Sequence, residues 1–499
     1  IFLILVVAII YLSIFGIKTK KFNNQITDSI LKIDKNINLD LKDVKYLLNP
    51  YNFTVDIKTK NSKISIDGKS VEIKHIKTNI ALKSLFNNEY LIDYLKLETK
   101  KIKLNDIVAL AQFFQQSPQL FVLNTIIKDG LITANVNLNF DDKGNIKKDY
   151  QIEGSVKEAK LNILNQFKLQ NLNLDFDINN NSIILKKIEM KLNDIAITSP
   201  KIKIEEKENL FFVNGQFLND EKNFDIIELK PIFVNIPKYI DINKIEFSSK
   251  NNFSFNISKK LKFNDFKIDS TIELKKLIFD KKYSKLNSYF PSFAEEIKLT
   301  NHQININYDK KKIDIKGSGN ISLGEKLDNL SYQIKKDQNN FLFDLKMNIK
   351  NNSLWIDFLD YKKKEGLSSL VSIKGHFKKN NQLSFDLINL KEQNNKISIK
   401  GLDLTENFQI IDIENFNVNY INDKKILNNL NLRKEKFNFI IEGESFDSSS
   451  MINNIIDSDD ENLPIFHNLN SKINIKIKKT YIDEVNFMNN LNGDINYNN

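Results

Sequence analysis

Apolar and polar residues alternate along most of this chain, and this pattern limits the possible folds more than any other feature of the sequence. In one run, Phe53, Val55 and Ile57 are each separated from the next by one polar residue. Because neighbouring side chains of a β-strand point to opposite faces, a period of two predicts strands with one apolar and one polar face. The same period predicts that the apolar face also carries Val136, Leu138, Phe140, Leu174, Phe176, Ile178, Phe253, Phe255, Ile304, Ile306, Phe341, Phe343, Leu345, Phe385, Leu387, Ile473 and Ile475.

Short polar segments separate the predicted strands and fit hairpin turns between antiparallel neighbours. The clearest examples are Asp141 to Asn145, Asn179 to Asn181, Asp309 to Lys312 and Lys378 to Asn381. At about 11 to 12 residues per strand and turn, the body of the chain predicts on the order of 40 strands. The chain has only 7 Pro and 14 Gly and contains no linker rich in them, so we expect one continuous body over residues 39–499.

Few segments have helical spacing. The sequence predicts a helix over Asp106 to Gln116 that ends before Pro118, a short helix over Ser450 to Ile456, and a helix over Lys281 to Ile297 that is broken at Pro291. A mainly β fold with so few helices must cover its apolar face in another way. The sheet either closes on itself as a sandwich or barrel, or curls into an elongated open groove that a ligand completes. Alternation alone leaves both possibilities open.

The first 17 residues, Ile1 to Ile17, carry no charge, and three lysines follow between positions 18 and 21. As a helix with a rise of about 1.5 Å per residue this segment extends about 26 Å, near the lower limit for crossing a bilayer. A cleaved signal peptide would end in a small-x-small site, which Ser13-Ile14-Phe15 does not supply. The sequence therefore predicts a transmembrane anchor over residues 1–17 and a helical connector over residues 18–38, with its helix between Phe22 and about Lys35.

Charge and cysteine content exclude several classes of function. The net charge is +10, but 73 basic and 63 acidic residues are interleaved along the chain, whereas phosphate binding needs clustered positive charge. We therefore expect no nucleic-acid partner. The chain has no cysteine, which excludes disulfides and thiolate metal sites. The four histidines, His75, His302, His376 and His467, lack partners at metal-ligand spacing and are interpreted as surface or turn residues.

No motif predicts an enzyme. Gly317 and Gly319 resemble part of a phosphate-binding loop but lack a following helix, so they predict a hairpin turn. The acidic run from Asp457 to Glu461 is interpreted as a solvated loop and not as a calcium site. Trp355 is interpreted as a packed strand residue, and no G-x-S-x-G motif occurs. We expect no catalytic residues, no metal and no cofactor.

The order of segments resembles a known family. An apolar N-terminal segment precedes LDLKDVKYLLNPYNFTVDI (Leu39 to Ile57), and DIVALAQFFQQSPQL precedes the strand-like Ile126 to Phe140 and Tyr150 to Leu164. Later segments of the same type are ISIKGLDLTENFQIIDIENFNV (Ile397 to Val418) and FIIEGESFDSSSMINNIID (Phe439 to Asp457). This arrangement is similar to that of the AsmA-like family, most closely the branch containing YhdP, with TamB as a more distant relative.

The resemblance implies a single-pass inner-membrane protein with a periplasmic body that bridges toward the outer membrane. Its repeating β-groove would carry phospholipid acyl chains, with membrane lipids and an outer-membrane or periplasmic protein as partners. Members of the family usually continue beyond the point that corresponds to Asn499. Two other functions stay open: an assembly factor for outer-membrane or secreted proteins that offers strand edges, and a structural β-rod filled by its own side chains.

Overall fold

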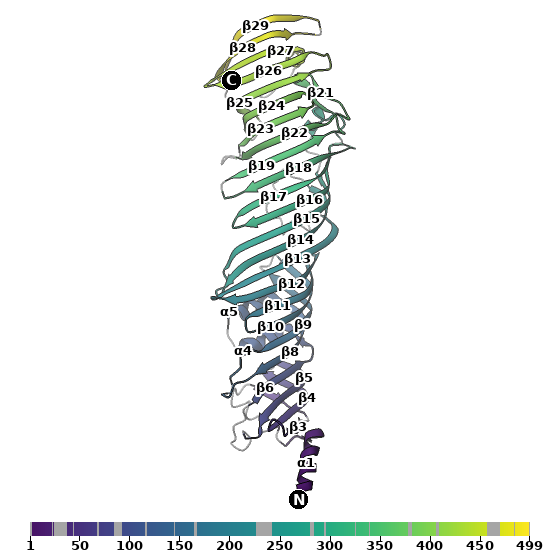
Figure 1. The fold of residues 1–499 in the computed structure, drawn as a ribbon, viewed down its shortest axis with the longest axis vertical. Helices are drawn as coiled ribbons and strands as arrows, with labels where there is room; N and C mark the ends of the chain where they lie inside the picture. Colours follow the sequence, from purple (N-terminus) through teal and green to yellow (C-terminus); the bar gives the residue numbers. More distant parts are fainter. Residues whose placement is uncertain are drawn as a thin grey trace. The chain divides into compact units, whose positions relative to one another are not determined.

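The protein is mainly β, and 27 of its strands belong to one open, mostly antiparallel sheet (Figure 1). The chain forms two compact units, residues 1–220 with 251–266 (unit 1) and residues 221–250 with 267–499 (unit 2). This computed structural model describes residues 2–21, 23, 37–42, 44–66, 69–83, 92–114, 117–143, 145–163, 167–225, 242–279, 284–293, 296–324, 326–338, 340–377, 382–405, 409–456, 470–483 and 485–498.

Unit 1 contains helices α1 (Phe2–Ile14), α4 (Leu104–Phe114) and α5 (Pro118–Ile126). Its strands are β1 (Ile17–Thr19), β2 (Ile37–Asp40), β3 (Val44–Asn49), β4 (Thr54–Ile66), β5 (Lys69–Ala81), β6 (Ile92–Thr99), β7 (Ile102–Lys103), β8 (Ile127–Asn139), β9 (Gln151–Ile163), β10 (Phe167–Asn179), β11 (Ser182–Leu192) and β12 (Ile195–Lys207). Strands with residues in both units are β13 (Leu210–Asp225), β14 (Ile242–Ser258) and β15 (Phe263–Phe279).

Unit 2 contains helix α7 (Ser449–Ile456) and the 3-10 turns η1 (Ser284–Ser288) and η2 (Asp357–Leu359). Its strands are β16 (Ile297–Asp309), β17 (Lys312–Ser322), β18 (Leu327–Lys336), β19 (Phe341–Ile349), β20 (Leu354–Ile356), β21 (Tyr361–Lys363), β22 (Ser369–Phe377), β23 (Leu383–Glu392), β24 (Asn395–Leu404), β25 (Ile410–Ile421), β26 (Leu427–Glu435), β27 (Asn438–Asp447), β28 (Asn470–Tyr481) and β29 (Phe487–Asn498).

Strand pairing in unit 1 follows the order of the chain. From β8 to β13 each strand pairs antiparallel with the next. Both β2 and β3 pair with β4, and β1 adds to the outer side of β3. Several strands contain β-bulges at residues with positive φ, such as Asn171 (51°) and Lys187 (49°). A bulge adds one residue to one strand, which bends that strand and increases the local twist.

Unit 2 departs from simple antiparallel order at two places. The small hairpin β20–β21 lies outside the sheet, so β19 pairs with β22. Strands β27 and β28 pair in parallel, and α7 lies in the connection between them. Parallel neighbours need such a longer crossover because the chain must return to the same end of the sheet.

The hairpin turns predicted from polar segments are confirmed where the structure describes them. Lys310 and Lys311 join β16 to β17 with φ of 47° and 73°. Two positive φ values give a type I′ turn, whose twist matches that of the flanking strands. In the turn after β8, the Asp141 carboxylate accepts hydrogen bonds from the backbone N–H of Lys143 and Asn145. The predicted turn over residues 378–381 lies outside the described residues.

The N-terminal segment differs from the prediction. Its helix, α1, ends at Ile14, and Gly16 follows with φ of 64°, a left-handed conformation that commonly ends helices. The chain then enters strand β1, so residues 17–19 are not helical. In the part of the chain that the structure describes, no helix combines the length and hydropathy needed to cross a membrane. The connector helix predicted between residues 22 and 35 lies outside the described residues, apart from Asn23.

The predicted helices are partly confirmed. Helix α4 begins two residues before the predicted start, and α7 begins one residue before it. Helix α5 was not predicted, although Pro118 stands at its first position and the Ser117 side chain accepts a hydrogen bond from the Leu120 N–H. Between residues 281 and 297 the structure describes only η1 as helical.

Gly317 and Gly319 do not form the predicted turn, because both lie inside β17. Gly317 pairs with Tyr332 on β18, and a Cβ atom at Gly317 would lie 2.3 Å from Cζ of that ring. A Cβ at Gly319 would lie 2.4 Å from Cδ2 of His302. These glycines therefore make room for rings from the neighbouring strands. The predicted strand number is also too high, because the strands are longer than assumed, with 17 residues in β14.

We predict that Gly317→Val lowers the free energy of unfolding of unit 2 by about 1 to 3 kcal/mol, because the new side chain must displace the Tyr332 ring. Gly493→Val on β29 is the control, because a Cβ at that position meets nothing within 4 Å. Denaturant unfolding of both variants tests this expectation. Equal stability of the two variants would show that the Tyr332 ring does not need this space.

Candidate functional site on the apolar face

The apolar face of unit 1 is continuous across neighbouring strands. Leu174 and Phe176 on β10 pack with Val156, Ala159 and Ile188 from the strands on either side. The Phe176 ring lies over Gly154 on β9, where a Cβ atom would be 2.5 Å from the ring. Side chains of adjacent strands therefore interlock across the sheet, as the predicted alternation requires.

A row of phenylalanines extends the apolar face of unit 1. The ring centroids of Phe217 and Phe253 are 4.7 Å apart and the rings are stacked. Phe255 lies 5.9 Å from Phe253 and 4.6 Å from Phe263. Phe253 and Phe255 belong to the predicted face, whereas Phe217 and Phe263 were missed because their own strands alternate less regularly.

Unit 2 carries a similar aromatic group on β19, β22 and β23. The Phe377 ring lies 5.1 Å from Phe341 and 6.0 Å from Phe343, and Phe343 lies 5.9 Å from Phe385. Gly375, between Phe343 and Phe385 in the pairing, leaves space that the Phe343 ring fills. We name Phe341, Phe343, Phe377 and Phe385 the unit-2 aromatic group.

Most of the predicted face is only half-buried. Ile57, Leu174, Phe176 and Phe253 are buried, whereas the other residues that lie on this face keep intermediate exposure. In a closed sandwich the facing sheet would bury such side chains almost completely. The half-buried residues are Val55, Val136, Leu138, Phe140, Ile178, Phe255, Ile304, Ile306, Phe341, Phe343, Leu345, Phe385, Ile473 and Ile475.

Two predicted residues do not lie on the apolar face. Phe53 lies in the turn before β4 with φ of 51°, and its side chain is 72% exposed. Leu387 pairs with Lys374 and Lys400, so it points to the polar face. The reason is a bulge at Asp386, which shifts the alternation of β23 by one residue. Phe140 lies just beyond the end of β8, in an isolated bridge with Ile146.

Because of this bulge, Ile388 lies on the apolar face in place of Leu387. Ile388 pairs with Ile373 and Ile399 and packs in an apolar cluster with Leu402 and Phe439. Sequence reasoning missed this shift. The signal was present, because two adjacent apolar residues interrupt a strict period of two.

One end of the unit-2 strands is covered by segments that leave the sheet. Phe290 and Phe293 follow η1, and Leu354, Leu359 and Tyr361 come from the β20–β21 hairpin and η2. These five side chains are buried against the strand residues Ile321, Ile349, Leu390, Ile397, Val418, Tyr420 and Phe446. The unit-2 aromatic group lies toward the opposite end of its strands and does not belong to this cluster.

A buried polar network fixes this cover to the sheet. The Asn422 amide donates hydrogen bonds to Asp360, next to β21, at 3.2 Å and to Asp447, at the end of β27, at 2.9 Å. Lys424 Nζ lies 3.1 Å from Asp360 and 3.3 Å from Asp447. Burial alone would raise the pKa of Asp447, but hydrogen bonds from Ser449 and the charge of Lys424 hold that pKa below its usual range.

A second polar group holds the loop before the β20–β21 hairpin. The Asp328 carboxylate accepts hydrogen bonds from the backbone N–H of Lys350 and Asn351, each at 2.8 Å. Lys363 Nζ donates to the carbonyl oxygens of Lys350 at 3.1 Å and Asn352 at 2.5 Å. Burial lowers the pKa of Lys363. Both groups are structural, because their polar atoms are directed at each other and at the backbone.

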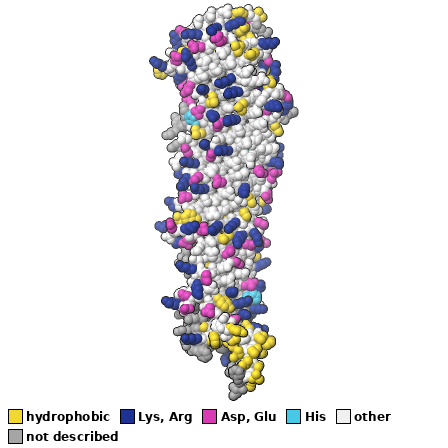
Figure 2. Space-filling model, viewed as in Figure 1, with side chains coloured by type: hydrophobic (Ala, Val, Ile, Leu, Met, Phe, Trp, Pro, Cys, Tyr) yellow, Lys and Arg dark blue, Asp and Glu magenta, His cyan; other side chains and the backbone are white. Residues whose placement is uncertain are grey.

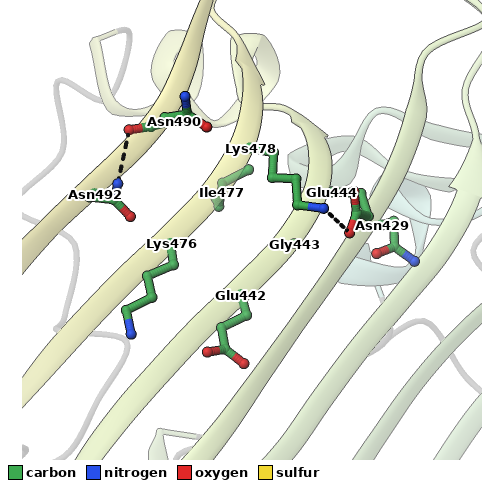
Figure 3. A pocket seen from close by; sticks show the side chains of 9 residues that line it. All are labelled: Asn429, Glu442, Gly443, Glu444, Lys476, Ile477, Lys478, Asn490 and Asn492. Atoms are coloured by element: carbon green, nitrogen blue, oxygen red, sulfur yellow. Dashed lines mark hydrogen bonds and ion pairs between the residues drawn. The ribbon is translucent and has the colours of Figure 1, made fainter.

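The polar face contains a shallow pocket of about 380 Å³ over β26 to β29 (Figure 3). Glu442 and Glu444 on β27 face Lys476 and Lys478 on β28, and Lys478 Nζ lies 2.8 Å from Glu444. The formal charges of these four side chains cancel, so the pocket offers a ligand no net charge. The remaining lining residues are Asn429, Gly443, Ile477, Asn490 and Asn492.

The histidines occupy different environments. His75 lies 3.9 Å from Glu98, and His376 Nδ1 lies 3.2 Å from Asp386, both on partly exposed positions. His302 is buried, which corrects its interpretation as a surface residue, and its Nε2 lies 2.9 Å from the Asn320 carbonyl oxygen. His467 lies outside the described residues, as does the acidic run 457–461. Within the described ranges, no group of three or more His, Asp or Glu is placed to hold a metal ion.

No family model matches the chain, and no curated protein sequence matches it. The resemblance to the AsmA-like family therefore stays a prediction from the sequence.

We predict that unit 2 becomes less stable as the pH falls from about 7 to about 5. Burial lowers the pKa of His302, so the folded state binds fewer protons than the unfolded state, whose histidine has a pKa of about 6.5. The stabilisation is complete above that value and is lost as the pH falls below it. The measurement is the unfolding free energy across this pH range.

The variant His302→Gln keeps a polar side chain of similar size but removes the titration, so it is expected to flatten this part of the pH dependence. His376→Gln is the matched control. If both variants keep the full pH dependence, protonation of His302 does not cause the loss.

Proposed function

We propose that this protein is a membrane-anchored envelope bridge that carries phospholipid acyl chains along its apolar face, between an inner and an outer membrane. The observation that supports this most is the half-buried state of the apolar face. Side chains such as Phe343 and Ile306 are apolar, aligned across consecutive strands and still partly accessible. An acyl chain would cover the area that the protein leaves open.

The energetics of lipid transfer explain the use of such a face. Exposing one methylene to water costs about 0.8 kcal/mol, and the two tails of a phospholipid hold about 30 of them. A lipid therefore leaves a bilayer very slowly on its own. An apolar surface that stays in contact with the tails removes most of this cost along the whole path.

A path for lipids must also avoid strong binding at any single point. The face consists mainly of Phe, Ile, Leu and Val and lacks the convergent polar groups that fix small molecules in specific pockets. The buried charges around Asp447 and Asp328 lie under the cover, paired within the protein. The aromatic rows of the two units offer similar surfaces to a passing acyl chain.

The cellular location rests on the N-terminal segment and on the resemblance. Helix α1 is apolar along its entire length and is followed by Lys18, Lys20 and Lys21. We propose that it attaches the protein to the inner membrane and that the body lies in the periplasm, with an outer-membrane or periplasmic partner. The sheet then provides the route away from that membrane.

Photocrosslinking on β23 tests this function with a matched pair of positions. Phe385 and Leu387 are both apolar and only two residues apart, but they lie on opposite faces. A photoreactive phenylalanine analogue at position 385 is expected to give phospholipid adducts in cells, several-fold more than at position 387. Mass spectrometry of the adducts measures this ratio.

Equal or absent lipid adducts at the two positions would contradict the proposed transport. Adducts with newly made outer-membrane proteins in place of lipid would favour the assembly-factor function. Native mass spectrometry of the full chain released from detergent provides a second measurement, because a lipid carrier is expected to retain bound phospholipid.

A further inference from the structure

The turn between β3 and β4 exposes two aromatic side chains. Tyr51 is 94% exposed and Phe53 is 72% exposed, whereas Thr54, the next residue, is buried. The turn itself is ordered by hydrogen bonds: Asn52 N–H donates to the Asn49 side chain at 3.3 Å, and Leu82 N–H donates to the Phe53 carbonyl oxygen at 2.8 Å. Both rings are therefore exposed to solvent on a turn that hydrogen bonds keep ordered.

This turn lies on the side of unit 1 from which α1 extends. Strand β1 pairs with β3 so that Ile17 lies opposite Tyr46 and Thr19 opposite Val44. Because β1 and β3 are antiparallel, α1, which precedes β1, lies at the same end of this strand pair as the turn that follows β3. Gly16 packs closely on the backbone of Tyr46, and α1 contacts β3. Figure 1 shows α1 next to β3.

Helix α1 has apolar residues on every side, with Ser13 the exception. Its exposed apolar side chains follow one side of the helix. These include Leu3 (76%), Ile4 (73%), Val7 (57%), Ile10 (51%), Tyr11 (56%) and Ile14 (61%). Figure 2 shows hydrophobic side chains gathered over this part of the molecule. A helix that docks in a protein groove has one apolar stripe, whereas a helix that is apolar on all sides fits a lipid environment. Because the turn lies beside α1, a bilayer that surrounds α1 is also the favoured partner of the turn.

The charges near α1 and the aromatic residues of the turn also favour a bilayer as the partner of this surface. Lys18 and Lys45 lie opposite each other on β1 and β3, and Lys21 follows close by, all at the base of α1. Lysines at this level meet the phosphates of an anionic leaflet. Tyrosine and other aromatic residues concentrate at the level of the headgroups, where one side of the ring is apolar and the other contacts water.

We propose that Tyr51 and Phe53 insert into the headgroup region of an anionic bilayer and form a second membrane contact beside α1. This inference rests on the membrane attachment in the proposed function. Two contacts fix the orientation of unit 1 at the membrane surface. Helix α1 alone, joined to the sheet through the short strand β1, would not fix it. The first apolar cluster of the sheet, Val44, Ile57 and Ile80, then lies next to the membrane surface, where acyl chains enter.

A tryptophan reporter in the full chain tests the contact. Trp355 is the only tryptophan, so Trp355→Phe gives a silent background for Phe53→Trp. With vesicles of phosphatidylcholine and phosphatidylglycerol, the emission of the new tryptophan is expected to shift to shorter wavelength. Lipids brominated near the headgroup end of the acyl chain are expected to quench it at least twofold more than lipids brominated near the tail end.

Phe437→Trp is the matched control, because Phe437 is 82% exposed and lies in the turn between β26 and β27 of unit 2. Its emission is expected to stay unchanged when vesicles are added. Val7→Trp in α1 reports separately on insertion of the helix. A quenched reporter at position 7 with no quenching at position 53 would overturn the second contact and leave the attachment through α1 intact.

Absence of quenching at both positions would overturn the inference together with the proposed anchor. Transport itself is judged separately, by the lipid adducts at Phe385. The double variant Tyr51→Asp, Phe53→Asp gives a functional readout, because both side chains are exposed and the fold does not require them. It is expected to lower the yield of lipid adducts at Phe385 several-fold, and an unchanged yield would show that this turn does not assist lipid entry.

Discussion

The pleat of the β-strand is the constraint on which this structure depends. Each strand presents one apolar face, and a chain with so few helices must find another cover for it. Unit 2 solves this at one end of its strands, where η1, the β20–β21 hairpin and η2 bury their own apolar side chains against the sheet. The opposite end carries the unit-2 aromatic group and stays partly accessible. The division between covered and accessible surface therefore follows from where the chain leaves the sheet.

Glycines and bulges decide which residues form the accessible surface. Gly154 and Gly375 lack side chains at positions that the rings of Phe176 and Phe343 occupy. A larger residue at either position would push the ring away from the sheet. The bulge at Asp386 reverses the faces along β23, and Ile388 takes the place that Leu387 would hold. The smoothness of the apolar surface thus depends on a few backbone positions as well as on its side chains.

The sequence predicted the mainly antiparallel β fold and most residues of the apolar face, because both depend on local alternation. It did not predict that the N-terminal helix ends at Ile14. It located α4 and α7 within two residues and the turn at Lys310 and Lys311. It placed Phe53 in a strand although Pro50 and Asn52 mark a turn. It also missed the bulge at Asp386, although the adjacent apolar residues Leu387 and Ile388 interrupt the period of two. The network of Asp360, Asn422 and Asp447 joins residues up to 87 positions apart in the sequence, so no local sequence pattern predicts it.

The accessible part of the apolar face is unfavourable in water by about 25 cal/mol per Å² of apolar area. Folding alone does not require it, because polar residues at the open ends of the strands would satisfy the same backbone pairing. The chain uses buried ions and hydrogen bonds to fix its cover at one end, and removal of one partner from such a buried pair typically costs about 3 to 5 kcal/mol. A cover held so firmly keeps the inserted segments from sliding over the Phe341 and Phe385 region. The acyl chain of the proposed lipid transport would account for both features, because it is apolar and would cover the surface that the chain leaves accessible.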